Sequence, residues 1–187
     1  RFQDKVVVIT GGDKGIGRAI AIAFAREGAS IVNGYYQDVD ASTETVAMMK
    51  KFKGAVEALQ MDVRVKKDCE KLVETAVKRF GRLDIAINNA GVSTMNWAVD
   101  LTEEDWDFNM DVNAKGVFFC CQAQVKQFLQ QGGGGKIVRK AMRHLGEEVR
   151  GRGRHDDKVG LAREPDMADL GLVLEVEQVG EGLLLGE

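Results

Sequence analysis

A short glycine-rich segment near the amino terminus constrains this chain more than any other feature. It reads Thr10-Gly11-Gly12-Asp13-Lys14-Gly15-Ile16-Gly17 and follows the apolar run Val6-Val7-Val8-Ile9. Apolar residues then recur at helical spacing from Ile16 onward. A strand, a glycine turn and a helix in this order bring free N–H groups and the positive end of a helix dipole close to a pyrophosphate. The segment therefore predicts a dinucleotide-binding turn.

Strand-like and helix-like segments continue to alternate up to residue 138. Strands are expected at 5–10, 29–34, 55–61 and 83–88, and a fifth begins at 136. Helices are expected at 15–27, 41–53, 69–80 and 111–130, and another starts after a Thr102 N-cap. Strands that alternate with helices of this length form a parallel sheet covered on both faces. The expected fold class is therefore α/β, a Rossmann-like doubly wound parallel sheet that is truncated after its fifth strand.

The composition changes abruptly after residue 138. Residues 139–187 contain no aromatic residue, serine, threonine or isoleucine, and the segment is arginine-rich before it becomes acidic. A helix fits 140–150 poorly, and a weak strand fits 172–179. We therefore expect a dinucleotide-binding domain at 1–138 and an atypical tail of unknown structure at 139–187. The change has two open explanations, a shifted reading frame or splice product and a natural tail used for partners.

Composition limits the remaining function classes. The net charge of −3 gives no reason to expect a nucleic-acid or anionic-membrane partner, and the apolar runs are too short for a membrane span. The three cysteines, Cys69, Cys120 and Cys121, do not form a disulfide framework. Cys120 and Cys121 lie in an apolar helical run, so buried, inert thiols are expected. These features favour a reducing, cytoplasmic setting, and we expect no metal site.

Five motifs occur in an order that is typical of one family. After the glycine turn come Asp62-Val63, Asn88-Asn89-Ala90-Gly91, Val112-Asn113-x-x-Gly116 and Gly134-Gly135-Lys136-Ile137-Val138. Over residues 1–138 the chain resembles the short-chain dehydrogenase/reductase family in its ordinary single-domain form. The glycines before the fifth strand and the region around Trp106 look like polyol, sugar or acetoin-type members. The resemblance implies an oxidoreductase that uses NAD(P)(H) on a small-molecule alcohol or carbonyl, and a homo-oligomer.

The resemblance also implies roles for individual residues. Pyrophosphate contacts are implied for Gly11, Gly15, Ile16 and Gly17. Asp62 would accept a hydrogen bond from the adenine amino group, with the Val63 backbone beside it. The adenosine ribose would lie against Asn89, Ala90 and Gly91. Asn113 would be the catalytic asparagine, which in the family holds a water molecule of the proton relay.

Other readings of these residues remain open. Gly11 and Gly17 could serve only as turn residues, and Asp62 could cap the helix that follows it. Asn88 is expected to tie neighbouring backbones together rather than to contact a ligand. Asn113 is unfavourable in the middle of a helix, and it could simply support a kink.

The choice between the two nicotinamide cofactors depends on charge. NAD-selective members end the second strand with an acid that binds the ribose 2′-hydroxyl, and the aligned residue here is Tyr35. The nearest acids, Asp38 and Asp40, are expected to lie too far along the chain. In NADP-dependent relatives a basic residue at the position of Lys14 pairs with the 2′-phosphate. NADP(H) is therefore favoured over NAD(H).

The residues that carry proton transfer in the family are missing from this sequence. The only tyrosines are Tyr35 and Tyr36, and no serine follows Ser93. No Tyr-x-x-x-Lys motif occurs, so little or no turnover is expected from this chain alone. The alternative to an enzyme is a non-catalytic nucleotide-binding pseudoenzyme or interaction module. We also expect the fifth strand to lack a paired neighbour, which would leave an exposed sheet edge.

Overall fold

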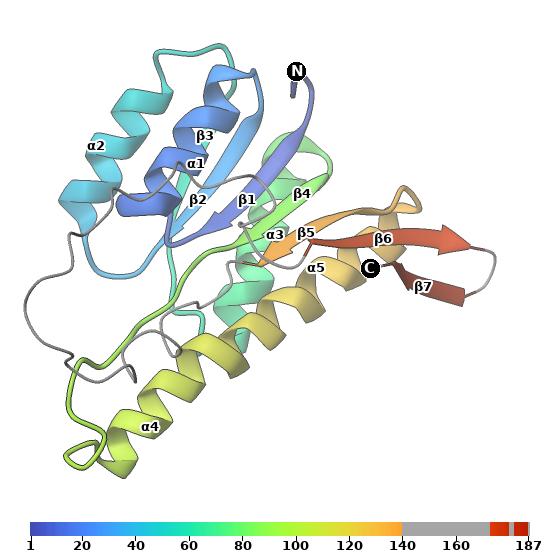
Figure 1. Cartoon of the computed structure of the whole chain (residues 1–187). Helices are drawn as coiled ribbons and strands as arrows, with labels where there is room; N and C mark the ends of the chain where they lie inside the picture. Colours follow the sequence, from blue (N-terminus) through green and yellow to red (C-terminus); the bar gives the residue numbers. More distant parts are fainter. Residues whose placement is uncertain (140–172, 180–181, 187) are drawn as a thin grey trace, which may run out of the picture.

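The structure is a computed structural model that describes residues 1–139, 173–179 and 182–186. Its strands form one sheet in the order β3-β2-β1-β4-β5-β6-β7 (Figure 1). The first five strands are parallel to their neighbours. They comprise β1 Val6–Thr10, β2 Ser30–Tyr35, β3 Val56–Gln60, β4 Ile85–Asn88 and β5 Gly135–Arg139. The α/β doubly wound fold with a parallel five-strand sheet is confirmed.

Alternate residues of β1 point to opposite faces of the sheet, and each face has its own core. Val6 and Val8 belong to the cluster beneath α3 (Lys66–Phe80) and α5 (Val117–Gln131), which includes Leu72 and Phe128. Val7 belongs to the cluster beneath α1 (Gly15–Arg26) and α2 (Val39–Met49). Every residue of β1 is buried. A strand buried on both faces is expected to be a continuous apolar run, as Val6–Ile9 is here.

The helix ends follow the capping chemistry expected from the sequence. Thr102 begins α4 (Glu103–Met110) with a reciprocal capping box, in which Asp105 Oδ2 accepts from the Thr102 N–H at 3.0 Å. Gly81 ends α3 at φ 83°, a left-handed conformation that glycine adopts without strain. The second helix starts earlier than expected because Asp38 accepts from the Ala41 N–H at 3.0 Å and so caps it.

The long helix expected at 111–130 is not uniform. It begins with a π-helical segment, η1 (Asp111–Gly116), and continues as α5. Such wide turns leave backbone groups displaced from the regular ladder and occur often at functional sites. The helix fitted to 140–150 lies outside the described residues.

The expectation that the fifth strand would lack a neighbour is wrong. Strand β5 pairs antiparallel with β6 (Val173–Val179), and β6 pairs antiparallel with β7 (Gly182–Gly186). In Figure 1 these strands extend the sheet beyond β5. The strand expected at 172–179 therefore forms. Its backbone groups pair with those of β5, at the sheet edge that was expected to be exposed.

Candidate functional site

The glycine turn between β1 and α1 is shaped for a close approach of another molecule. Gly11 has φ 62° and Gly15 has φ 55°, both in the left-handed region. A Cβ atom at Gly17 would lie 2.0 Å from the Gly11 carbonyl oxygen, whereas one at Gly15 would meet nothing within 4 Å. Gly17 therefore permits packing within the turn, and Gly15 faces open space.

The start of α1 has the properties of an anion site. Its N-cap residue, Lys14, makes no side-chain capping bond, and the first turn of the helix contains no acid. Its first N–H groups and helix dipole therefore face the cleft without a side-chain acceptor from this turn. The Asp13 carbonyl accepts from Arg18 Nε at 3.0 Å and from Thr45 Oγ1 at 2.8 Å, which fixes the turn from behind.

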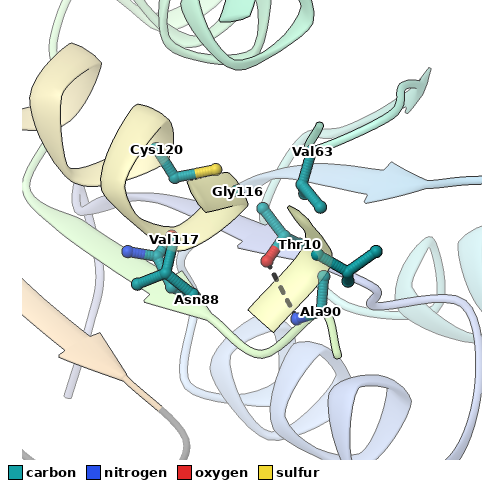
Figure 2. A pocket seen from close by; sticks show the side chains of 8 residues that line it. Thr10, Val63, Asn88, Ala90, Gly116, Val117 and Cys120 are labelled. Atoms are coloured by element: carbon teal, nitrogen blue, oxygen red, sulfur yellow. Dashed lines mark hydrogen bonds between the residues drawn. The ribbon is translucent and has the colours of Figure 1, made fainter. Parts of the chain in front are cut away.

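Two polar residues hold the carboxyl ends of β1 and β4 together. Thr10 Oγ1 accepts the backbone N–H groups of Asn89 at 3.1 Å and Ala90 at 3.0 Å; Figure 2 draws the second of these bonds. Asn89 Nδ2 donates to the carbonyls of Thr10 at 3.1 Å and Gly11 at 2.9 Å. The Asn89 side chain thus holds the glycine turn in place. Its buried Oδ1 has no partner among the described residues.

Beside these strand ends, the π-helical segment η1 packs closely against the loop after β3. Figure 2 shows Gly116 facing Val63, with Thr10, Asn88, Val117 and Cys120 around them. A Cβ atom at Gly116 would lie 2.8 Å from Val63 Cγ2. Glycine at this position lets η1 approach the loop after β3, which accounts for its place in the Val112-Asn113-x-x-Gly116 motif.

An open cleft of about 780 Å³ lies at this edge of the sheet. Its lining unites ten of the eleven residues that the sequence assigned to the site: Gly11, Lys14, Gly15, Ile16, Gly17, Asp62, Val63, Asn89, Ala90 and Gly91. Ligands of open α/β sheets bind where the strand order reverses, and this cleft lies at that point, between β1 and its two neighbours.

Asn113 is the site residue that does not line the cleft. Its Oδ1 accepts from the Val92 N–H at 2.9 Å, and its Nδ2 donates to the Val92 carbonyl at 2.8 Å. Val92 itself lines the cleft. Asn113 therefore fastens η1 to the loop after β4, and both ends of its amide are engaged.

Asp62 binds Arg64, a contact that the sequence did not predict. Its Oδ2 lies 2.6 Å from Arg64 Nη2, and its Oδ1 accepts the Arg64 N–H at 2.9 Å. Hydrogen bonds from the Arg64 side chain, and then from its backbone, hold the pKa of the Asp62 carboxyl below its ordinary value. Asp62 does not cap α3, because the N-cap is Val65 and no side chain caps it. The capping alternative is wrong.

Asn88 has a structural role, as expected. Its side chain forms a reciprocal pair with Gln124 of α5, with Nδ2 to Oε1 at 3.0 Å and Oδ1 to Nε2 at 2.8 Å. Both side chains are buried. The partner is a helix side chain rather than the neighbouring backbone that the sequence suggested.

All three cysteines are free thiols, and Cys120 contacts Cys69 of another helix rather than its chain neighbour Cys121. Cys120 Sγ lies 3.4 Å from Cys69 Sγ of α3. The Cys69 contact and burial raise the pKa of the Cys120 thiol far above its ordinary value, and burial also raises the pKa of the Cys121 thiol. Thiols of this kind remain protonated and unreactive.

The charges near the glycine turn are balanced. Lys14 Nζ lies 3.6 Å from Asp38 Oδ2, and both residues line the cleft. The expectation that Asp38 lies too far along the chain is therefore wrong, because the bend after β2 turns this residue back toward the cleft. Asp40 does not line it.

The described part of the chain shows no metal-binding group and no membrane-spanning helix. No three His, Cys, Asp or Glu side chains among the described residues are grouped to hold a metal ion. None of the helices described is long and apolar enough to cross a bilayer.

Sequence comparisons relate this chain to known oxidoreductases. Residues 5–141 match the family described as short chain dehydrogenase. The chain is 37% identical over 137 residues to 2-dehydro-3-deoxy-D-gluconate 5-dehydrogenase of Escherichia coli K12, which covers 73% of this chain and 53% of that protein. It is 37% identical over 139 residues to 3beta-hydroxysteroid dehydrogenase of Mediterraneibacter gnavus, with 74% and 49% covered. The chain spans about half the length of the curated relatives it matches.

Solved structures give the same result. A short chain dehydrogenase from Burkholderia cenocepacia J2315, in complex with NADP, superposes with a TM-score of 0.70 at 30% identity, over 76% of this chain and 57% of that chain. A putative short-chain alcohol dehydrogenase from Sinorhizobium meliloti gives a TM-score of 0.70 at 34% identity, over 74% and 54%.

Proposed function

Because this chain belongs to the short-chain dehydrogenase family, we propose that it binds a nicotinamide dinucleotide, NADP(H) in preference to NAD(H), in the cleft beside Gly15. The observation that supports this most strongly is the convergence of the glycine turn, the Asp62-Val63 pair and the Asn89–Gly91 segment on one cleft of about 780 Å³. These residues come from three different loops of the sheet edge.

The residues present fit such a ligand. The uncapped start of α1 and the left-handed Gly15 offer N–H groups and space to the pyrophosphate. The Asp62 carboxylate lines the cleft and would accept from the adenine amino group once part of its contact with Arg64 is released. Asn89 and the two residues after it would lie beside the ribose. The cofactor, when bound, supplies the hydride, and the protein supplies position.

The relatives support assigning residues 1–138 to cofactor binding. Two of them differ in the substrate of their name, 2-dehydro-3-deoxy-D-gluconate and a 3beta-hydroxysteroid, yet each matches this chain over a segment of similar length. What they share with this chain is therefore independent of the substrate. We place the cofactor-binding unit at 1–138 and treat 139–187 as a separate tail, whose described strands extend the sheet away from the cleft.

The chain is proposed to bind the cofactor without turning a substrate over. Its tyrosines are Tyr35 and Tyr36, and no serine follows Ser93. The Tyr-x-x-x-Lys pair that by family resemblance exchanges the proton accompanying hydride transfer is missing from this sequence. Asn113, the catalytic asparagine by family resemblance, is proposed to support the site through Val92 in this chain.

We expect calorimetric titration of the purified chain to show saturable NADPH binding. A screen of polyols, sugars and ketones with the same sample should show no change in absorbance of the reduced cofactor. Oxidation of any alcohol with matching NADPH formation would contradict binding without turnover. Absence of binding by either cofactor would contradict the proposed function as a whole.

We expect NADPH to bind more tightly than NADH, and the Lys14→Met substitution to remove most of that difference. The Lys14 ammonium attracts a 2′-phosphate, although Asp38 at 3.6 Å shares its charge. The expected loss for NADPH is up to about fivefold, since an exposed ion pair contributes at most about 1 kcal/mol. Calorimetry with both cofactors measures it, and Lys78→Met, which removes a lysine of α3 paired with Glu74, is the control. Tighter NADH binding by the unmodified chain would overturn the preference.

A further inference from the structure

The Arg64 side chain is fixed by Asp62 at the adenine end of the cleft. Arg64 Nε lies 3.0 Å from each carboxylate oxygen of Asp62, and Nη2 lies 2.6 Å from Oδ2. The Arg64 N–H adds a further bond of 2.9 Å to Oδ1. Both oxygens of Asp62 are therefore occupied by one residue. Planar, charge-assisted contacts of this kind are stronger and more directional than those of a lysine.

The same guanidinium bridges two walls of the cleft. Its carbon lies 5.6 Å from the centre of the Tyr36 ring and 5.5 Å from that of the Phe108 ring. Arg64 Nη2 also donates to the Tyr36 hydroxyl at 2.9 Å. Tyr36 directly follows β2, and Phe108 belongs to α4. All three residues line the cleft, so the arginine side chain contacts both walls and connects them.

This arrangement conflicts with a free adenine subsite. In the proposed function, Asp62 accepts from the adenine amino group, yet Arg64 already takes both of its oxygens. A base cannot reach that carboxylate until the guanidinium gives up part of its contacts. Arg64 is partly exposed, with 31% of its side chain accessible, so it can move outward without unpacking the core.

We propose that Arg64 is a latch on the adenine subsite, closed by Asp62, Tyr36 and Phe108 and opened when the adenosine part of a dinucleotide binds. This inference rests on the proposed function and concerns the same cleft. The affinity measured for the cofactor is then the intrinsic affinity reduced by the fraction of molecules in which the latch is open. Removing the latch raises that fraction and tightens binding.

Calorimetry on the full chain with two probes tests the latch. NADPH carries adenine, and nicotinamide mononucleotide does not. We expect Arg64→Met to lower the Kd for NADPH about tenfold, because an exposed ion pair and two cation–π contacts together favour the closed state by roughly that factor. Arg64→Lys keeps the charge but loses the planar fork, and should lower the Kd about threefold. The mononucleotide affinity should not change in either variant.

The matched control is Arg79→Met. Arg79 is an arginine of α3 that pairs with Glu57 at 3.2 Å and does not line the cleft. The Arg79→Met variant loses the same positive charge as Arg64→Met, and its NADPH affinity should equal that of the unmodified chain. Thermal melting of each variant verifies that it is folded.

The outcomes separate the latch from the proposed function. Normal NADPH binding by the unmodified chain with an unchanged or raised Kd in Arg64→Met overturns the latch alone. A loss confined to NADPH, with NADH unaffected, would show that Arg64 holds the 2′-phosphate, which also overturns it. If neither the unmodified chain nor any variant binds a dinucleotide, the proposed function fails and the latch fails with it.

Discussion

Gly17→Ala should abolish measurable NADPH binding and lower the free energy of unfolding. The new methyl carbon would lie 2.0 Å from the Gly11 carbonyl oxygen and 2.5 Å from Asn89 Nδ2. The carbonyl cannot retreat freely, because Asn89 Nδ2 holds it at 2.9 Å. The turn must therefore open, which costs about 1–3 kcal/mol as in other overpacked sites. Displacing the turn also moves the N–H groups that would face the pyrophosphate of the proposed cofactor, and we expect a loss of NADPH affinity on the order of a hundredfold or more.

The matched control for this substitution is Gly133→Ala. A Cβ atom at Gly133 would meet nothing within 4 Å, and the residue is exposed. Calorimetry and thermal melting of both variants should show an effect for Gly17→Ala alone. An alanine at residue 17 that leaves the NADPH affinity intact would mean that the glycine is only a turn residue.

Gln124→Leu should destabilise the chain strongly without changing cofactor affinity. The substitution keeps the side-chain volume close to that of glutamine but removes the two Gln124 contacts of the buried Asn88 amide, at 2.8 and 3.0 Å. Asn88 Oδ1 is then left without a partner, and Nδ2 keeps only Cys121 Sγ at 3.4 Å. A buried polar group left without partners costs about 1–3 kcal/mol. For a chain of this length we expect the melting temperature to fall by about 2–12 °C, at about 2–4 °C for each kcal/mol. Because Asn88 does not line the open cleft, the NADPH affinity of the folded fraction should stay the same.

Gln130→Leu, at an exposed position of the same helix α5, is the control for this experiment. It should leave the melting temperature nearly unchanged. A weaker NADPH affinity for folded Gln124→Leu would show that Asn88 helps to form the ligand site.

The parallel part of the fold could be predicted because each local pattern had one physical solution. Four apolar residues in β1 cannot be exposed on either face, and so they require helices on both sides. Thr102 indicated the start of a helix through capping chemistry that depends only on adjacent residues. The antiparallel partner of β5 could not be predicted in the same way. Its pairing depends on residues far along the chain, and although a weak strand was expected at 172–179, nothing in the local sequence indicated which strand it would join.

The glycine turn and the residues after β3 and β4 were predictable for a related reason. Parallel strands bring their carboxyl ends to one edge, and the cleft unites Gly15, Asp62 and Asn89 there. Arg64 and Phe108 were missed because they meet only across the cleft, from α4 and the loop after β3. The arginine directly after Asp62-Val63 was the available signal. Thr10 was missed because a threonine at a strand end has many ordinary roles.

The most direct test of cofactor binding at this sheet edge is the amide NMR spectrum of the labelled chain with and without NADPH. We predict that the largest shifts fall at Gly11, Gly15 and Gly17, at Asp62 and Val63, and at Asn89 through Gly91. Saturable shifts confined to any other surface, with these amides unmoved, would contradict the claim that this sheet edge holds a nicotinamide dinucleotide.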